Sequence, residues 1–176
     1  MELTKICDGL DFPEGPIAMA DGSIILVEIR RQTLSRVTPD GAIDVIAHLG
    51  GGPNGAAVGP DGMIYVCNNG GFVWTQKEGI TRPVGTPEDY VSGSIQRVDP
   101  ATGDFETIYE SCNGTPLRGP NDIFFDAEGG FYFTDLGKAN ADYMHHGAFY
   151  YAKIDGSHIR RVHSPMITAN GIGLSP

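Results

Sequence analysis

The chain has 176 residues, 40% of them hydrophobic, and a formal net charge of −10. This acidic balance, with no basic run, argues against nucleic acid and anionic membranes as partners. The N-terminus shows no signal, transit or transmembrane pattern. Cys7, Cys67 and Cys112 lack the close spacing of a zinc site, so we expect free thiols and a cytoplasmic location.

The first predicted unit covers about residues 12–48. It reads as four short strands, two within IAMADGSIILVE (17–28) and two within TLSRVTPDGAIDVIA (33–47). Each pair is joined by Asp-Gly, which between β-forming runs is a hairpin signal. The preceding segment Glu2–Cys7 looks like a further strand, of the kind that would close a ring of such units.

The same pattern returns in a second unit at about 53–112 and a third at about 119–164. Their inner pairs of strands are AAVGPDGMIYVCN (56–68) and IFFDAEGGFYFTD (123–135), and their outer pairs are GSIQRVDPATGDFETIYE (93–110) and GAFYYAKIDGSHIRRVH (147–163). Four-stranded blades of about 40–50 residues are typical of a β-propeller, and no helical period competes. We therefore predict one all-β domain over 1–176, a partial propeller with three four-stranded blades and the first strand of a fourth at about 168–176.

Such an arc would leave strand edges unpaired, and a second chain could complete the ring. Two links between strands are long, at about 69–92 and 136–146. Blade topology places both at the end where inner strands begin, where long loops often act as lids. They carry Phe72, Trp74 and Tyr90, and Tyr143, His145 and His146, respectively.

Each predicted inner strand opens with an oxygen-bearing residue. The four openings are Glu14-Gly15-Pro16, Asn54-Gly55-Ala56, Asn121-Asp122-Ile123 and Asn170-Gly171-Ile172. Inner strands surround the channel of a propeller, so these side chains should converge, and a Glu14 buried there would need a cation or a partner. One carboxylate and several amide oxygens suit a hard cation such as calcium or magnesium. The alternative is that these are turn dipeptides leading into strands.

Four motifs resemble one known family. They are FPEGP (12–16), GPND (119–122), FYFTD (131–135) and ANGIGLSP (169–176). Together they are similar to the senescence-marker-protein/gluconolactonase/LRE-like (regucalcin-like) family, whose members are six-bladed β-propellers and in many cases metal-dependent sugar lactonases. The resemblance covers essentially the whole chain, which corresponds to about the first four-sevenths of a typical member.

The resemblance implies roles for particular residues. Glu14, Asn121 and Asn170 fall on the positions of the family's metal ligands. Asp122 would orient the side chain of Asn121 without itself contacting the metal. Asn54 is a candidate substrate contact. So is Arg118, although the family's arginine would fall one place later, at Gly119. The family's general-base aspartate belongs to the fifth blade and would lie beyond residue 176, so no catalytic residue is identified in the chain.

The implied function is hydrolysis of a sugar lactone, as in gluconolactonases, which are carboxylic-ester hydrolases. Calcium is the preferred metal, with magnesium, manganese or zinc as other options, and this chain alone could be inactive. Two alternatives stay open at this point. One is a non-enzymatic propeller module that binds calcium or a partner, and the other is a propeller aryl-ester hydrolase.

Overall fold

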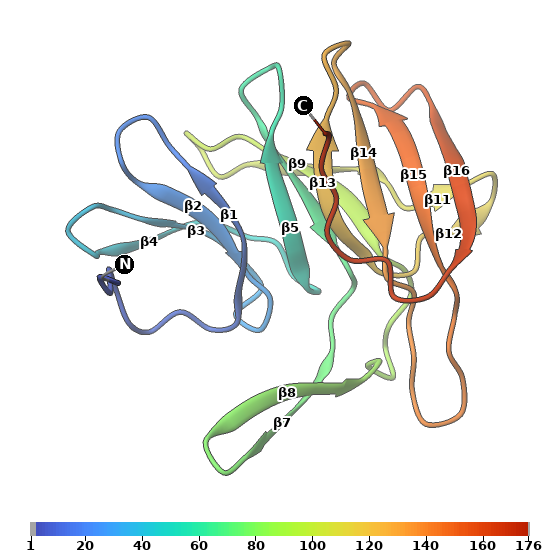
Figure 1. Cartoon of the computed structure of the whole chain (residues 1–176), viewed down its shortest axis with the longest axis horizontal. Coiled ribbons are helices and arrows are strands. Elements are labelled where there is room, and N and C mark those ends of the chain that lie inside the picture. Colours follow the sequence, from blue (N-terminus) through green and yellow to red (C-terminus); the bar gives the residue numbers. More distant parts are fainter. Residues whose placement is uncertain (1–2, 176) are drawn as a thin grey trace.

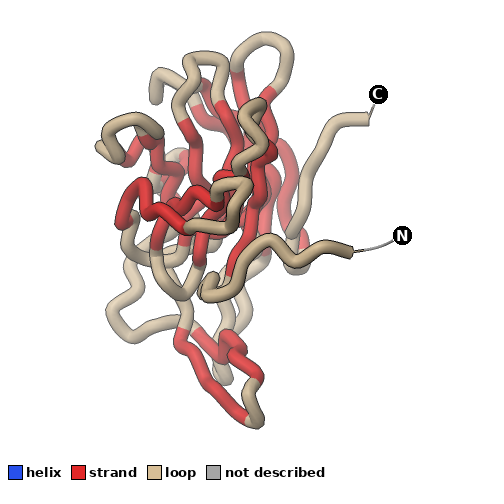
Figure 2. Tube along the Cα trace, turned by 90° about the vertical axis from the view of Figure 1, so that its left-hand side faces the viewer, coloured by secondary structure: helices blue, strands red, loops and turns tan. Residues whose placement is uncertain are grey.

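The computed structural model describes residues 3–175. Within this range the chain forms strands and loops and no helix (Figure 2). The strands make three four-stranded antiparallel sheets and two two-stranded hairpins. The all-β prediction is confirmed. Among the described residues no sheet closes on itself, and the number of blades in a complete ring stays a prediction. The same range holds no helix of the length and hydropathy needed to cross a membrane.

In each sheet the strands lie in chain order, from an inner strand to an outer one (Figure 1). The first sheet contains β1 (Pro13–Ala18), β2 (Ile24–Glu28), β3 (Thr33–Val37) and β4 (Ile43–His48). The middle sheet contains β5 (Pro53–Val58), β6 (Ile64–Asn68), β9 (Ser94–Val98) and β10 (Phe105–Tyr109). The third contains β13 (Pro120–Phe125), β14 (Gly130–Asp135), β15 (Gly147–Lys153) and β16 (Ile159–Met166). Strand β5 contacts both β1 and β13, which brings the three inner strands together.

The middle sheet is packed on both of its faces. In β6, Ile64 and Val66 belong to the core shared with the first sheet. The alternate residues Tyr65 and Cys67 belong to the core shared with the third. This explains why β6 is a continuous apolar run and not an alternating one. Each such buried side chain contributes about 1.5–3 kcal/mol, so β6 holds two cores together.

Two insertions extend from the sheets on the side where β1, β5 and β13 begin (Figure 1). The first, at 69–92, contains the hairpin β7 (Val73–Lys77) and β8 (Ile80–Gly85). The second, at 136–146, is a loop closed by a bridge between Ala139 and Met144. The hydroxyl of Thr86 donates to the carbonyl of Ala139 at 3.1 Å and joins the two insertions. The remaining hairpin pairs β11 (Ser111–Cys112) with β12 (Thr115–Pro116).

Two expected strands are not formed. Residues 3–7 and 168–175 are loop, whereas we expected strands at Glu2–Cys7 and at 168–176; Glu2 and Pro176 lie outside the described residues. A strand requires backbone pairing with a neighbour, and neither segment pairs with another described strand. The C-terminal segment runs beside β13 (Figure 1), where Ile172 N–H donates to Asp122 Oδ2 at 2.9 Å.

The three cysteines are free thiols, as their spacing predicted. Cys67 and Cys112 are buried. Burial, with the nearby Asp122 and Asp135 carboxylates, raises the pKa of Cys67 well above its ordinary value, so this thiol acts as a packed core residue.

Candidate functional site

Each sheet begins its inner strand with a proline followed by an oxygen-bearing residue. The pairs are Pro13–Glu14, Pro53–Asn54 and Pro120–Asn121. The register shifts close to each proline, between Glu14 and Ile17, Pro53 and Gly55, and Pro120 and Ile123. Proline has no N–H to give to the ladder, and a bulge re-aims the side chains at a strand end. Asn54 and Asn121 thus fall within the irregularity, out of regular strand alternation, and Glu14 lies directly before it.

A buried polar residue stands opposite each of these prolines, at the end of the second strand. These anchor residues are Glu28, Asn68 and Asp135, and none is more than 4% exposed. Each accepts a hydrogen bond from the backbone that enters the inner strand. The donors are Asp11 N–H to Glu28 at 2.6 Å, Gly52 N–H to Asn68 at 2.8 Å, and Arg118 and Gly119 N–H to Asp135 at 2.8 and 2.7 Å. The chain is therefore fixed two or three residues before each oxygen-bearing side chain.

The glycines that follow Glu14 and Asn54 let the inner strands approach closely. A Cβ atom at Gly55 would lie 2.3 Å from the carbonyl oxygen of Asn121. A Cβ at Gly15 would lie 2.7 Å from the backbone nitrogen of Ala56. Both distances are too short for a side chain. The glycines thus bring the three inner strands together at the level of Glu14, Asn54 and Asn121.

The four predicted positions meet around one cavity of about 380 Å³, here called the oxygen cavity. It is lined by Glu14, Asn54, Asn121, Asp122 and Asn170, with Gly15, Pro16, Gly55, Ala56 and Gly171 between them. Asn121 is 5% and Asn54 9% exposed. Glu14 and Asn170 are exposed, so the expectation of a buried Glu14 is wrong. Glu14 stands at the rim of an open cavity, where water solvates its carboxylate.

The donor chemistry of the oxygen cavity can be matched to a cation. Within residues 3–175, the side chains of Glu14, Asn54, Asn121 and Asn170 form no hydrogen bond with the protein, and all four line the open cavity. Carboxylate and amide oxygens suit calcium or magnesium. In the same range no three His, Cys, Asp or Glu side chains gather as metal ligands. The residues present therefore fit a hard cation better than zinc.

Asp122 holds a different partner from the one expected. Its Oδ1 accepts the N–H of Ile123 and its Oδ2 the N–H of Ile172, both at 2.9 Å, and no bond joins it to the Asn121 amide. The carboxylate thereby ties the segment that carries Asn170 to β13. Asp122 positions Asn170 and not Asn121.

Arg118 does not line the oxygen cavity. Its backbone N–H is bound to Asp135, and its carbonyl accepts the hydroxyl of Tyr90. An arginine one place later is excluded by space, because a Cβ at Gly119 would lie 2.5 Å from the carbonyl oxygen of Gly137. The structure thus separates Arg118 from the other candidate residues.

Sequence reasoning missed Lys138, which is only 3% exposed. Its Nζ donates to the carbonyl of Gly71 at 2.5 Å and to Asn69 Oδ1 at 3.3 Å. The Nζ also lies 4.3 Å from the ring centroid of Phe72 and 5.0 Å from that of Tyr90. Burial lowers the pKa of Lys138 to about 8, against the opposing effect of Asp135. A lysine in a polar loop normally faces water, so the sequence offers no signal for this role.

His145 and His146 differ in their surroundings. His145 is partly buried and its Nδ1 has no partner in the described structure, whereas His146 is exposed. Burial and the neighbouring Arg118 charge lower the pKa of His145, which keeps the ring neutral near pH 7. Neither histidine lines the oxygen cavity.

Comparison with known proteins decides the family. The model of the SMP-30/gluconolactonase/LRE-like region matches residues 12–176. The chain belongs to this family. The resemblance drawn from the four sequence motifs is thereby confirmed.

Individual relatives agree with the family assignment. A gluconolactonase of Zymomonas mobilis is 26% identical over 97% of this chain and 48% of its own length. A solved structure titled as a candidate gluconolactonase has a TM-score of 0.68, with 19% identity over 96% of this chain and 54% of that one. The gluconolactonase XC5397 of Xanthomonas campestris has a TM-score of 0.62, with 21% identity over 86% of this chain and 47% of that one. The chain therefore spans about half the length of the relatives that it matches.

Proposed function

We propose that the chain carries the cation-binding part of a divalent-metal-dependent sugar-lactone hydrolase, with calcium as the preferred metal. One observation carries the proposal. Oxygen-bearing side chains from four separate segments, Glu14, Asn54, Asn121 and Asn170, line one cavity, and within the described residues they form no hydrogen bond with the protein. Family membership and similarity to a protein named gluconolactonase support the reaction class.

We assign the residues the roles that the family resemblance implies. Glu14, Asn121 and Asn170 would hold the cation, and Asn54, next to them in the cavity, would contact the substrate. When bound, the cation supplies polarisation of the lactone carbonyl and stabilises negative charge on its oxygen. Asp122 keeps Asn170 in place through Ile172. We assign no general base within residues 3–175; a carboxylate from outside this range would remove a proton from water and return one to the leaving alkoxide.

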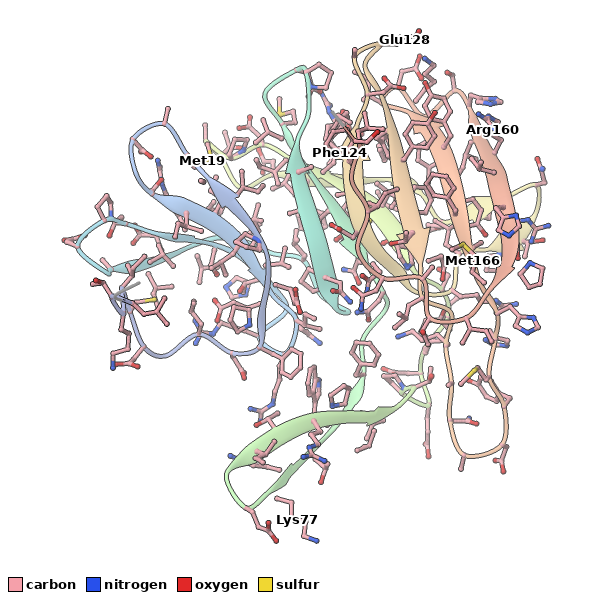
Figure 3. All side chains as sticks on the ribbon, in the orientation of Figure 1. Met19, Lys77, Phe124, Glu128, Arg160 and Met166 are labelled. Carbon is pink, nitrogen blue, oxygen red and sulfur yellow. The ribbon has the colours of Figure 1, made fainter. Side chains whose placement is uncertain are left out.

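The cation site is tested by thermal unfolding with calcium or with EDTA. Calcium should raise the melting temperature of the parent protein, since saturation at about 100 times Kd stabilises by about 2.7 kcal/mol. The variant Glu14→Gln should lose most of this increase. Glu128→Gln is the matched control, because Glu128 lies on a turn at the far end of the sheets from the β7–β8 tip at Lys77 (Figure 3). Equal calcium effects in both variants would reject the site.

The reaction is tested separately by following acid release from glucono-δ-lactone with and without calcium. We expect slow calcium-dependent hydrolysis above the spontaneous rate, because the cation polarises the lactone carbonyl even where no general base is supplied. Calcium binding at Glu14 with no hydrolysis of any lactone would reject the hydrolase proposal. That result would favour the calcium-binding module.

A further inference from the structure

A second cavity lies between the two insertions. Its volume is about 480 Å³, within the usual range for small-molecule sites. We call it the groove. Its walls include the apolar residues Phe72, Val84, Leu136, Ala139 and Met144. The first two come from the insertion at 69–92 and the others from the insertion at 136–146 and its root.

The two walls of the groove are tied to each other. Lys138, on one wall, binds Gly71 and Asn69 at the root of the opposite insertion and faces the Phe72 ring. The bond from Thr86 to Ala139 makes a second tie. A cavity whose walls are fixed in this way does not have to be ordered by its ligand. The groove is therefore a preformed site.

Little charge is available to a ligand in the groove. Lys138 is only 3% exposed, and its ammonium already has two oxygen partners. His145 also lines the groove, and burial keeps its ring neutral by lowering its pKa. Among the polar residues of the lining, the Thr86 hydroxyl already donates to Ala139 and Asn140 Oδ1 already accepts two backbone N–H groups. Sugar hydroxyls placed against the apolar walls would therefore find few hydrogen-bond partners, which is costly. Transfer of an alkyl group from water to these walls is favourable.

The groove lies next to the oxygen cavity. A Cβ at Gly52 would be 2.9 Å from Gly71, beside the groove residue Phe72. The backbones of Gly119 and Gly137 are equally close, and Gly137 lines the groove. Thr168 lines the groove and Asn170 lines the oxygen cavity, and two residues of chain span at most about 7 Å. One small molecule can therefore reach both cavities.

We propose that the groove binds the alkyl substituent of a lactone whose ring carbonyl lies at the oxygen cavity. This inference rests on the proposed lactonase function and extends its substrates beyond sugar lactones. Among lactones with the same ring, the one that carries an alkyl chain beside the ring is preferred. A lactone without one leaves the groove unfilled.

Two lactones with the same ring show how much the alkyl chain contributes to binding. δ-Decalactone carries a pentyl chain that δ-valerolactone lacks. Trp74 is the only tryptophan, and its ring centroid lies 5.9 Å from that of Phe72 in the groove wall. A saturable change of Trp74 fluorescence is expected with δ-decalactone. At least about tenfold weaker binding is expected for δ-valerolactone, because each buried methylene favours binding.

Two variants of strand β8 locate the binding site. Val84, 57% exposed, lines the groove, and Ile80, 51% exposed, lies on the same strand outside it. Val84→Asp should weaken δ-decalactone binding about tenfold or more, whereas Ile80→Asp should not change it. Both side chains are exposed, so both variants should fold, which circular dichroism checks. Equal binding of the two lactones, or equal effects of the two variants, would overturn the inference.

Hydrolysis measured on the same proteins distinguishes this inference from the proposed function. If calcium-dependent hydrolysis of glucono-δ-lactone occurs but δ-decalactone does not bind, the groove inference fails and the proposed function stands. If δ-decalactone binds through Val84 but no lactone is hydrolysed, the proposed function fails. The groove is then an alkyl-binding site without a lactonase reaction.

Discussion

Gly55 has no side chain where β5 passes the carbonyl of Asn121, and Gly15 has none where β1 passes β5. The same strands carry the oxygen-bearing side chains one residue earlier. At the scale of single residues, the cavity therefore depends on two adjacent positions in each of these strands, first a residue with an oxygen-bearing side chain and then a glycine. Neither residue alone would place the oxygens together.

The substitution Gly55→Ala tests this dependence. Its Cβ would meet the Asn121 carbonyl oxygen at 2.3 Å, so β5 and β13 would have to separate. We expect a loss of about 1–3 kcal/mol in the free energy of unfolding, as for other overpacked sites. Gly85→Ala is the control, since Gly85 is also in a strand and a Cβ there meets nothing within 4 Å. Similar urea midpoints for both variants would contradict the close-approach argument.

Lys138 provides a pH-dependent prediction. Burial lowers its pKa from 10.5 to about 8, so between these values the unfolded chain holds a proton that the folded protein has lost. The unfolding free energy of the parent, measured relative to that of Lys138→Met, should therefore rise as the pH increases from about 8 to 10.5. The full change is up to about 3 kcal/mol. Asp135, Tyr90 and His145, which face Lys138 or lie near it, are the same in both proteins.

Urea unfolding of the parent and of Lys138→Met at intervals between pH 7 and 10 measures this difference. A constant difference in unfolding free energy over that range would show that Lys138 titrates normally. The pKa of Tyr90, raised to about 12 mainly by burial, affects both proteins alike and so cancels.

At the scale of elements, the anchor residues join the second strand of each sheet to the start of the first. Asp135 shows the arrangement most fully, because its two oxygens accept the N–H groups of Arg118, Gly119 and Gly137. In the sequence, Asp135 ends the β-forming run FYFTD (131–135), and an aspartate in such a position can accept backbone hydrogen bonds. No sequence signal shows that Glu28 and Asn68 occupy matching positions, since a carboxylate and an amide look unrelated until the register is known.

Replacing Asp135 by Asn tests the anchor. An amide keeps one acceptor oxygen but presents an NH₂ group to the remaining backbone N–H, leaving buried donors facing each other. We expect a loss of about 2 kcal/mol or more in unfolding free energy, since hydrogen bonds to charged groups contribute about 1.5–3 kcal/mol each. The exposed Asp89→Asn is the control. Thermal melts that place both variants within about 0.5 kcal/mol of the parent would argue against an anchoring role.

Some parts of these elements could be predicted and others could not. Asp-Gly turns and β-forming runs were sufficient to indicate the strands, because both are local signals. The groove depends on contacts such as Lys138 with Gly71 and Thr86 with Ala139, which join residues far apart in the chain. The expected strand at 168–176 failed for a related reason, because composition shows that a segment can be a strand but does not supply its pairing partner.

At the scale of the whole molecule, the middle sheet carries two interfaces while its neighbours carry one each within the described residues. Strand β6 contributes alternate residues to both cores. Its backbone is paired on both sides, with β5 and with β9. The outer strand β16 is paired only with β15, and several of its residues are exposed.

Hydrogen exchange should follow this difference. Amides of β6 should exchange only through global unfolding, whereas those of β16 should exchange through local opening at a lower free energy. Mass spectrometry of peptides covering 64–68 and 159–166 measures both in one experiment. Equal protection of the two strands would mean that the three sheets open as one unit.

The anchored opening of each sheet has a consequence for how such proteins diversify. Each sheet contains, within itself or at its entry, its own proline, oxygen-bearing residue, following glycine or aspartate, and anchor residue. Each sheet can therefore be exchanged as one unit. Recombination at the loops could replace a neutral donor with a charged one and leave the others in register. The charge around a bound ion would then change in single steps, and ion preference could evolve without redesign of the scaffold.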